Sequence, residues 1–241
     1  PVLGPISCWG HNQQGQVGIG PDPFTGLLTD QHKPVAPNLP GGELSAHLVA
    51  AGGMHTLAVT ADGRTFAWGS NAYGQCGRCQ PDAPGGSANR DVFTPREVEA
   101  LRGASIVTLA AGFVHSLALL RDGSLLAWGC NKRGQLGVGE TSVAAVPEPT
   151  PVLVPCGVRA AVVSSGMEHT AVLSEDGRVF TCGNPQDGRL GRSEGLGDDG
   201  QPRVCFLLRP VHLGLAPGHC VTSLVAGWRR TLALIAWAMM P

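Results

Sequence analysis

The sequence is poor in charge and has no surplus of positive charge. Charged residues make up 15% of the 241 residues, and 17 basic against 18 acidic side chains give a formal net charge of −1. A protein that binds nucleic acid needs clustered lysine and arginine to neutralise phosphates. The balanced charge therefore argues against nucleic acid as a direct partner.

Long apolar runs are also missing. A membrane-spanning helix needs ~18 or more predominantly apolar residues in succession, and the most apolar run, 231–240, is too short and follows two arginines. We expect no secretory signal, because the N-terminus begins inside a repeat with a proline, which favours a piece of a longer polypeptide. A membrane is not expected as a partner.

The eight cysteines show no disulfide pattern. Cys76 and Cys79 form a single Cys-x-x-Cys, but no second pair stands at the spacing of zinc ligands. We interpret this motif as coincidence, and expect neither a metal nor a cofactor. Scattered cysteines favour a reducing intracellular compartment, the cytoplasm or nucleus, with a cytoskeletal or ciliary location left open.

Sequence motifs of common enzymes are absent as well. No Gly-Lys-Ser/Thr follows a glycine-rich loop, and no Gly-x-Ser-x-Gly elbow occurs. We therefore predict no catalytic residue and expect that the chain is not an enzyme, whereas the activity of a longer protein stays open.

What the sequence does have is glycine, proline and a repeat. The 35 glycines and 19 prolines suit short strands separated by tight turns. Four motifs, Gly-x-x-His, Asp-Gly, Trp-Gly and Gly-Gln-x-Gly, recur in order at a spacing of roughly sixty residues. Copies span 52–77, 112–137 and, more weakly, 166–191, with the tail of a copy at 9–18 and the head of another at 226–233. Such self-similarity indicates a modular fold.

The sequence of one repeat copy predicts four β-strands. Residues 56–60 and 64–68 form two strands, joined at Asp62-Gly63 by a type I′ turn in which both central residues have positive φ. A short outer strand is expected to start at a proline of each copy, where a missing N–H is tolerated at a sheet edge. The prolines are Pro34, Pro95, Pro151 and Pro210. A small-residue apolar strand such as 48–51 comes next.

Four strands in each repeat are typical of a propeller blade, which buries its faces on its neighbours. The sequence therefore predicts an all-β propeller of four-stranded antiparallel blades with about four repeat equivalents. We expect one repeat domain, 1–241, with blades near 1–47, 48–104, 105–159 and 160–220 and a partial repeat at 221–241.

The recurring polar and aromatic residues are predicted to be structural. Histidines at the same place in different blades do not form a metal triad, and we expect each imidazole to tie adjacent strands by hydrogen bonds. Aspartates before glycine make hairpin turns, and the tryptophans supply apolar area between blades. These residues are His55, His115 and His169; Asp62, Gly63, Asp122, Gly123, Asp176 and Gly177; and Trp9, Trp68 and Trp128.

The series H-[TS]-L-A-[VL]-x-x-D-G-x-x-x-A-W-G-x-N-x-x-G-Q-x-G in 55–77 and 115–137 resembles the repeats of the regulator of chromosome condensation family. That family's fold is a seven-bladed propeller. The resemblance implies a partial or truncated member whose blades belong to a larger ring, because an incomplete ring would expose apolar edges. Further blades or a partner would cover those edges; a closing blade made from both chain ends is also conceivable.

Three functions follow from this resemblance. The first is a non-enzymatic protein-interaction scaffold that presents variable loops to a partner or docks within a large assembly. The second is guanine nucleotide exchange on a small Ran-like GTPase, the activity of the founding member, although no matching loop is found. The third is a substrate-recruiting module of a multidomain ubiquitin ligase.

The candidate protein contacts lie in two stretches of sequence and one acidic loop. They are Lys132 and Arg133, then Trp228, Arg229 and Arg230, and the acidic stretch 194–199. Gly227-Trp228-Arg229 also resembles a segment of the plant ultraviolet-B photoreceptor of the same family. Light sensing would need several such tryptophans, and only one copy occurs, so we do not expect it.

Overall fold

The computed structural model describes residues 4–40, 45–78, 91–139, 143–192 and 203–237. In these ranges every regular element is a β-strand except two short 3-10 turns, η1 (Glu99–Leu101) and η2 (Gln186–Gly188). No helix within the described ranges has the length and apolar character needed to span a bilayer. Cys79 and the acidic stretch 194–199 lie outside the described residues.

Three sheets form complete four-stranded antiparallel blades in which strands adjacent in sequence are adjacent in the sheet. The first contains β4 (Ser45–Ala51), β5 (His55–Thr60), β6 (Thr65–Gly69) and β7 (Val92–Glu97), with β1 (Gly4–Pro5) beside β4. The second contains β8 (Ile106–Ala111), β9 (His115–Leu120), β10 (Leu125–Cys130) and β11 (Ala145–Pro151). The third contains β12 (Ala160–Ser165), β13 (His169–Ser174), β14 (Val179–Gly183) and β15 (Cys205–Val211).

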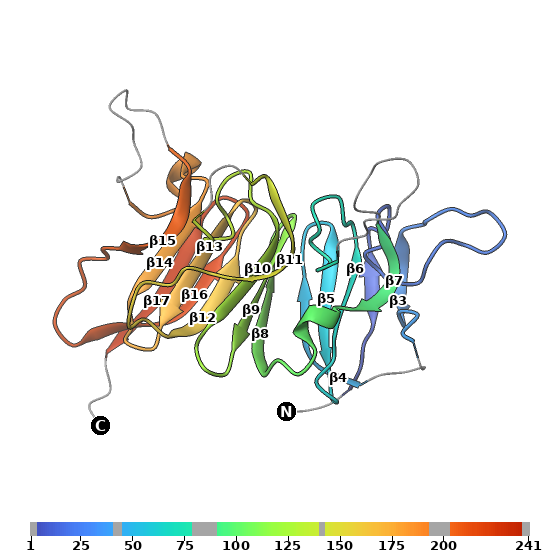
Figure 1. Ribbon diagram of the computed structural model, residues 1–241, viewed down its shortest axis with the longest axis horizontal. Helices are drawn as coiled ribbons and strands as arrows, with labels where there is room; N and C mark the ends of the chain where they lie inside the picture. The colour runs from blue at the N-terminus through green and yellow to red at the C-terminus, as the bar shows by residue number, and fades with distance from the viewer. Residues whose placement is uncertain (1–3, 41–44, 79–90, 140–142, 193–202, 238–241) are drawn as a thin grey trace.

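Two further sheets have only two strands each. They are β2 (Cys8–Gly10) with β3 (Gln31–Val35), and β16 (His219–Ala226) with β17 (Thr231–Trp237). Strand β3 lies at the right-hand end of Figure 1, well apart from β16 and β17 on the left. The two halves therefore form no closing blade with each other. The predicted all-β fold of four-stranded antiparallel blades is confirmed.

The apolar core lies between successive blades. Trp68 of the first blade belongs to one buried cluster with Trp128 of the second, and Leu117 of the second belongs to another with Phe180 of the third. A third cluster joins β13 to β16. Each blade thus buries a face against its neighbour, as expected for a repeat fold in which no unit has a complete core.

The Asp-Gly hairpins differ from the predicted type I′ turn. Gly63 has a φ of +82°, but Asp62 is not among the residues with positive φ. The Gly63 N–H donates to the Thr60 carbonyl (2.9 Å) and the Thr60 N–H to the Arg64 carbonyl (2.9 Å), which closes a three-residue loop. This is the loop in which a turn is followed by one left-handed glycine. The prediction of positive φ at both positions was wrong.

The hairpin aspartates instead act through their side chains. Asp62 Oδ2 accepts from Arg64 Nε (2.7 Å), and Asp122 Oδ1 accepts from the Ser124 N–H (3.0 Å). The hydrogen bond from Arg178 lowers the pKa of Asp176 to about 2. An aspartate at this position therefore fits the turn without leaving the ordinary backbone region.

Replacing Gly63 by alanine is expected to lower the free energy of unfolding by about 1 kcal/mol. An added Cβ would meet nothing within 4 Å, so the left-handed backbone alone causes the loss. Gly63→Asn should cost less, because asparagine tolerates this conformation better than alanine. Urea denaturation of the three proteins measures the difference, and equal stability of the alanine variant and the wild type would contradict this account.

The outer strands end near their prolines instead of starting there. Pro34 is the last residue but one of β3, and Pro151 is the last residue of β11. Pro95 and Pro210 also lie in the second half of β7 and β15. An outer strand has one unpaired side, so a residue without an N–H is tolerated at any position whose N–H would face away. The expected starting position was therefore wrong.

Candidate protein-interaction face

The repeated histidines connect neighbouring blades. His55 of β5 places Nε2 2.7 Å from Ser116 Oγ of the next blade. The Ser116 hydroxyl donates to the Gln75 carbonyl (2.8 Å), and Trp128 Nε1–H donates to the same oxygen (2.8 Å). One carbonyl of the Gly-Gln-x-Gly loop therefore binds two groups of the following blade, and the histidine reaches the same hydroxyl.

The same arrangement recurs at the next two interfaces. Thr170 Oγ1 donates to the Gln135 carbonyl (2.7 Å), with His115 Nε2 at 3.4 Å. At the last interface His169 Nε2 lies 3.0 Å from Thr231 Oγ1, which donates to the Arg189 carbonyl (2.8 Å). The sequence analysis placed these bonds between adjacent strands; the structure places them between adjacent blades.

The hydrogen bonds define the state of each imidazole. Because each hydroxyl donates to a carbonyl, its oxygen accepts from the Nε2–H of the histidine. The Nδ1 atoms are buried, with no hydrogen-bond partner among the described residues. Burial lowers the pKa of His55 to about 4 and of His115 to about 3. Burial, with a smaller effect of Arg189, lowers the pKa of His169 to about 4. The three imidazoles are neutral at pH 7.

The described residues show no cluster of metal-ligating side chains. No group of three or more His, Cys, Asp or Glu side chains there could hold a metal ion. The three histidines lie in three separate interfaces, each against a hydroxyl. Trp68 and Trp128 are fully buried, whereas Trp9, at the end of the blade series, is 64% exposed.

The candidate contact residues lie at one end of the blades. This end consists of the turns between the first and second strands of each blade and of the Gly-Gln-x-Gly loops, and we call it the turn face. Side chains shape its loops: Asn71 Oδ1 accepts from the Cys76 N–H (3.0 Å) and Gln75 Oε1 from the Tyr73 N–H (2.9 Å). These hydrogen bonds stabilise the fold of the loop at the end of its sheet.

Four inner turns meet around a small hollow at the centre of the turn face. Its volume is ≈ 220 Å³, and residues 51–53, 111–113, 165–167 and 226–228 surround it. Phe113 and Trp228 contact each other edge to face, with ring centroids 5.3 Å apart. Trp228 remains 56% exposed. An aromatic side chain is therefore presented to solvent beside the hollow.

Charged side chains of the turn face reach from one blade to the next. Lys132 Nζ lies 3.1 Å from the Tyr73 hydroxyl and 4.7 Å from its ring centroid, and this hydrogen bond raises the pKa of Lys132. Arg133 reaches Glu168 of the next blade at 3.9 Å, and Arg229 reaches Asp187 at 3.7 Å. Each cation is positioned by a group from a neighbouring blade.

A buried arginine completes this network. Arg189, whose side chain is 2% exposed, binds Asp187 at 2.7 Å and lies 3.8 Å from Glu168. Glu168, Asp187 and Arg189 are not among the residues that the sequence predicted. A signal exists for Arg189 alone: the third repeat has arginine where the other Gly-Gln-x-Gly loops have glutamine. Of the predicted contacts, Arg133 and Arg229 join this network through Glu168 and Asp187, whereas Lys132 lies on Tyr73. Trp228 and Arg230, the sequence neighbours of Arg229, are exposed.

The sequence matches a family model described as Regulator of chromosome condensation (RCC1) repeat over residues 6–59, 62–119, 122–173 and 176–234. The chain belongs to this family. A second RCC1 repeat model matches 47–75, 106–135 and 161–189, which are the parts that contain the inner hairpins.

This RCC1-repeat chain covers less than half of the length of its curated relatives. Probable E3 ubiquitin-protein ligase HERC3 of Homo sapiens is 34% identical over 187 residues, which cover 78% of this chain and 16% of that protein. Ultraviolet-B receptor UVR8 of Arabidopsis thaliana is 32% identical over 201 residues, 83% of this chain and 42% of the receptor. Protein pim1 of Schizosaccharomyces pombe is 29% identical over 94% of this chain and 42% of its own length.

Solved structures share the fold. Yeast RCC1 (Prp20), in a complex with Kap60, has a TM-score of 0.76 and 23% identity over 95% of this chain and 49% of that chain. Human WBSCR16 has a TM-score of 0.71 and 22% identity over 98% of this chain and 54% of that one. The chain therefore spans about half of an RCC1 propeller, which confirms the prediction of a partial member.

Proposed function

We propose that this RCC1-repeat chain is a non-enzymatic scaffold that binds a protein partner through the turn face. One observation carries the proposal: the recurring histidines and the tryptophans Trp68 and Trp128 are buried in contacts between blades, whereas Trp228, Lys132, Arg133 and Arg229 are exposed and do not recur. Tryptophan and arginine are the residues most often found at energetic centres of protein interfaces. Recognition residues on a rigid framework lose little conformational entropy on binding.

The variant Trp228→Ala/Arg229→Glu is expected to reduce binding of that partner at least tenfold, since both side chains are more than half exposed and available for contact. Affinity purification with quantitative mass spectrometry would compare this variant with the wild type. The matched control is Arg121→Glu, an exposed residue in the β9–β10 hairpin at the opposite end of the blades. The three proteins should unfold at similar temperatures. Equal recovery of every bound protein by all three would contradict the proposed face.

Likeness to HERC3 favours a second candidate, a substrate-recruiting module of a longer ubiquitin ligase. In that case the proteins lost from the Trp228→Ala/Arg229→Glu variant would include ones whose ubiquitination depends on the full-length ligase. We place either role inside the cell, where unpaired cysteines persist; the seven cysteines of the described residues are all free.

Nucleotide exchange on a Ran-like GTPase is the candidate that we favour least, because none of the described loops resembles a loop that promotes nucleotide release. The expected result is that an excess of the chain leaves the release of labelled nucleotide from such a GTPase unchanged. A dose-dependent acceleration would replace the scaffold proposal.

A further inference from the structure

Three arginines from consecutive blades meet around two carboxylates on the turn face. Arg133 follows β10 of the second blade, Arg189 follows β14 of the third, and Arg229 lies in the turn between β16 and β17. Arg133 and Arg189 lie 3.9 and 3.8 Å from Glu168. Arg189 and Arg229 lie 2.7 and 3.7 Å from Asp187. This arginine network therefore has one positive charge in excess of its two negative ones.

The two exposed arginines of the network keep their hydrogen-bond donors free. A charge-assisted hydrogen bond from nitrogen to a carboxylate oxygen spans about 2.7–2.9 Å. The ion pairs of Arg133 and Arg229 are longer than this, and no acceptor among the described residues forms a hydrogen bond with either guanidinium. Each planar guanidinium can therefore still bind a carboxylate through two parallel N–H groups.

Arg189 adds a charge that its loop does not need in order to fold. At the same place the other three Gly-Gln-x-Gly loops have a neutral side chain, Gln16, Gln75 or Gln135. Arg189 is buried there, and its Nη1 has no hydrogen-bond partner among the described residues. Burying a cation costs free energy that its ion pairs only partly offset. The charge is thus retained at a cost, and it offsets the negative charge of Glu168 and Asp187.

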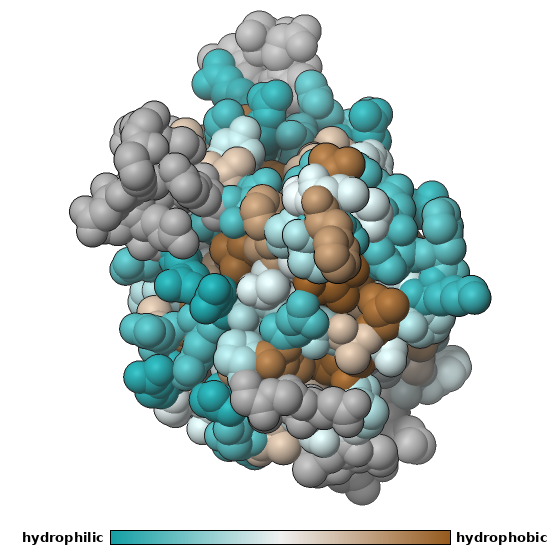
Figure 2. All heavy atoms as spheres, turned by 90° about the vertical axis from the view of Figure 1, so that its right-hand side faces the viewer, coloured by the Kyte–Doolittle hydropathy of each residue, from teal (hydrophilic) through white to brown (hydrophobic). Residues whose placement is uncertain are grey.

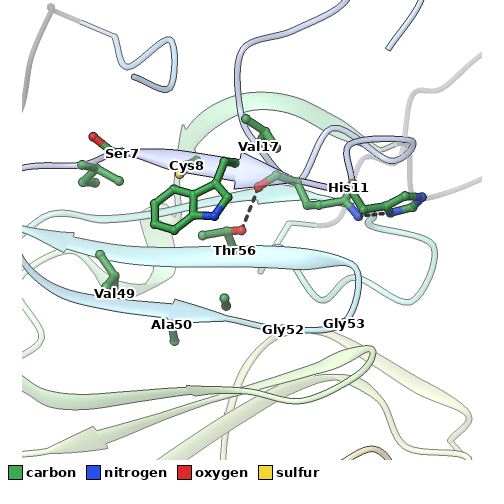
Figure 3. A pocket seen from close by; sticks show the side chains of 13 residues that line it. Ser7, Cys8, His11, Val17, Val49, Ala50, Gly52, Gly53 and Thr56 are labelled. Carbon is green, nitrogen blue, oxygen red and sulfur yellow. Dashed lines mark hydrogen bonds between the residues drawn. The ribbon is translucent and has the colours of Figure 1, made fainter. Parts of the chain in front are cut away.

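The first interface of the chain shows the neutral form of this loop. Figure 2 looks at that end of the molecule and shows hydrophobic residues gathered there. A hollow of ≈ 400 Å³ lies between β2 and β4, and Figure 3 shows the hydrogen bond that joins His11 to the amide of Gln16 in its lining (2.8 Å). None of the residues that line this hollow forms an ion pair within the described chain. The network of arginines is therefore particular to the third loop and its neighbours.

The backbone of the third loop is also unusual. Asp187 has a φ of +59° and is the one residue other than glycine with positive φ in the described ranges. Tyr73 and Arg133, at the same place in two other loops, do not share this conformation. Such a conformation is unfavourable for a residue with a side chain, and it occurs most often at functional sites. Here the carboxylate of Asp187 contacts both Arg189 and Arg229.

We propose that the arginine network binds an acidic segment of the protein partner, a short stretch rich in aspartate or glutamate. The inference rests on the proposed role of the turn face. Carboxylates of the segment bind the exposed Arg133 and Arg229. A further carboxylate binds Arg230, which is exposed and has no ion pair among the described residues. Complementary charges of this kind speed association and select the partner.

A run of phosphates fits this surface less well. Binding of nucleic acid depends on many cations that neutralise successive phosphates. The chain as a whole has a formal net charge of −1, and the network itself contains the carboxylates of Glu168 and Asp187. A few carboxylates on a protein segment match the small positive excess better.

A display library of short random peptides tests this chemistry without knowledge of the partner. Selection on the immobilised wild-type chain should enrich aspartate and glutamate, and binding of the selected peptides should weaken as salt is raised. Arg229→Glu should bind them about tenfold more weakly or worse. The matched control is Arg121→Glu, which changes the net charge equally at the opposite end of the blades and should bind them normally.

Asp187→Asn should have the opposite effect. Asparagine also tolerates a positive φ, so the loop is kept, while a carboxylate that competes for Arg229 is removed. The selected peptides should therefore bind this variant several-fold more tightly than the wild type. A purely structural role of the network predicts weaker binding instead, and that result would contradict the proposal.

Three other results would overturn the inference. The first is that the selected peptides have no acidic excess or bind Arg229→Glu as well as the wild type. The second is that an oligonucleotide binds the turn face more tightly than any selected peptide. The third is self-association of the chain that Arg229→Glu abolishes, because a second copy would then be the occupant. Partner recovery that is lost in Trp228→Ala but kept in Arg229→Glu would refute the acidic segment and leave the turn-face scaffold standing, whereas recovery kept in both would refute the scaffold as well.

Discussion

Acidification from pH 6.5 to pH 4 is expected to reduce the free energy of unfolding by several kcal/mol. His55 and His115 are fully buried, and their pKa values are lowered to about 4 and about 3. In the unfolded chain a histidine has a pKa of about 6.5. Between these values the unfolded state binds more protons, so stability falls as the pH falls. One pKa unit corresponds to about 1.4 kcal/mol, so each buried imidazole accounts for a loss of unfolding free energy on the order of 3 kcal/mol between pH 6.5 and pH 4.

The expected loss is large compared with the whole stability of a typical domain, about 5–15 kcal/mol. Urea denaturation at pH 7, 6, 5 and 4, followed by tryptophan fluorescence, measures it. The hairpin carboxylate of Asp176 has a pKa of about 2 in the folded chain, so most of its effect on stability is lost below pH 4 and it accounts for little of this change.

Two variants test whether the buried histidines cause this pH dependence. His115→Gln should be less stable than the wild type at pH 7, because it loses the bond to Thr170, and its stability should vary less between pH 6.5 and 4. His32→Gln removes an exposed histidine outside the blade interfaces and is the matched control. An undiminished slope in His115→Gln would show that protonation of the inter-blade histidines is not the cause.

The repeat made most of the fold predictable from sequence. Gly-x-x-His, Asp-Gly and Trp-Gly recur in order because each blade needs the same turn, hairpin and apolar ring, so their spacing gives the strands directly. The turn type was not predictable, since Asp62-Gly63 is compatible with any loop that needs one left-handed glycine. The positions at which an outer strand tolerates proline depend on which of its N–H groups pair with the neighbouring strand. That pairing is set by the whole sheet and cannot be read from the outer strand alone.

The turn face was predictable only in part. Lys132, Arg133, Trp228 and Arg229 occupy variable positions of the repeat motifs, and their charged or large aromatic side chains mark them as candidate contacts. Their partners Glu168 and Asp187 belong to other blades, at separations that no local pattern indicates. The role of histidine shows the same limit: its recurrence reveals a structural function, but only the arrangement of the blades shows that its acceptor is the hydroxyl of the next repeat.

Trp128→Ala is expected to reduce the free energy of unfolding by about 3–5 kcal/mol, the range for removal of a buried aromatic side chain. Trp128 is fully buried between the first and second blades, and its Nε1–H donates to the Gln75 carbonyl. Alanine leaves a cavity and removes one of the two donors to that oxygen. Trp128→Phe keeps a ring but not the donor, and should cost less than alanine. Chemical denaturation at pH 7 measures all three proteins.

Trp9→Ala is the matched control, because Trp9 occupies the same repeat position at the open end of the blade series. It is 64% exposed, so its loss should change stability by no more than about 0.5–1 kcal/mol. The contrast between Trp9 and Trp128 separates the intrinsic contribution of the Trp-Gly motif from that of the interface it fills. Similar losses from both substitutions would mean that the tryptophan stabilises its own hairpin, and the account of blades held together by the faces they share would then fail.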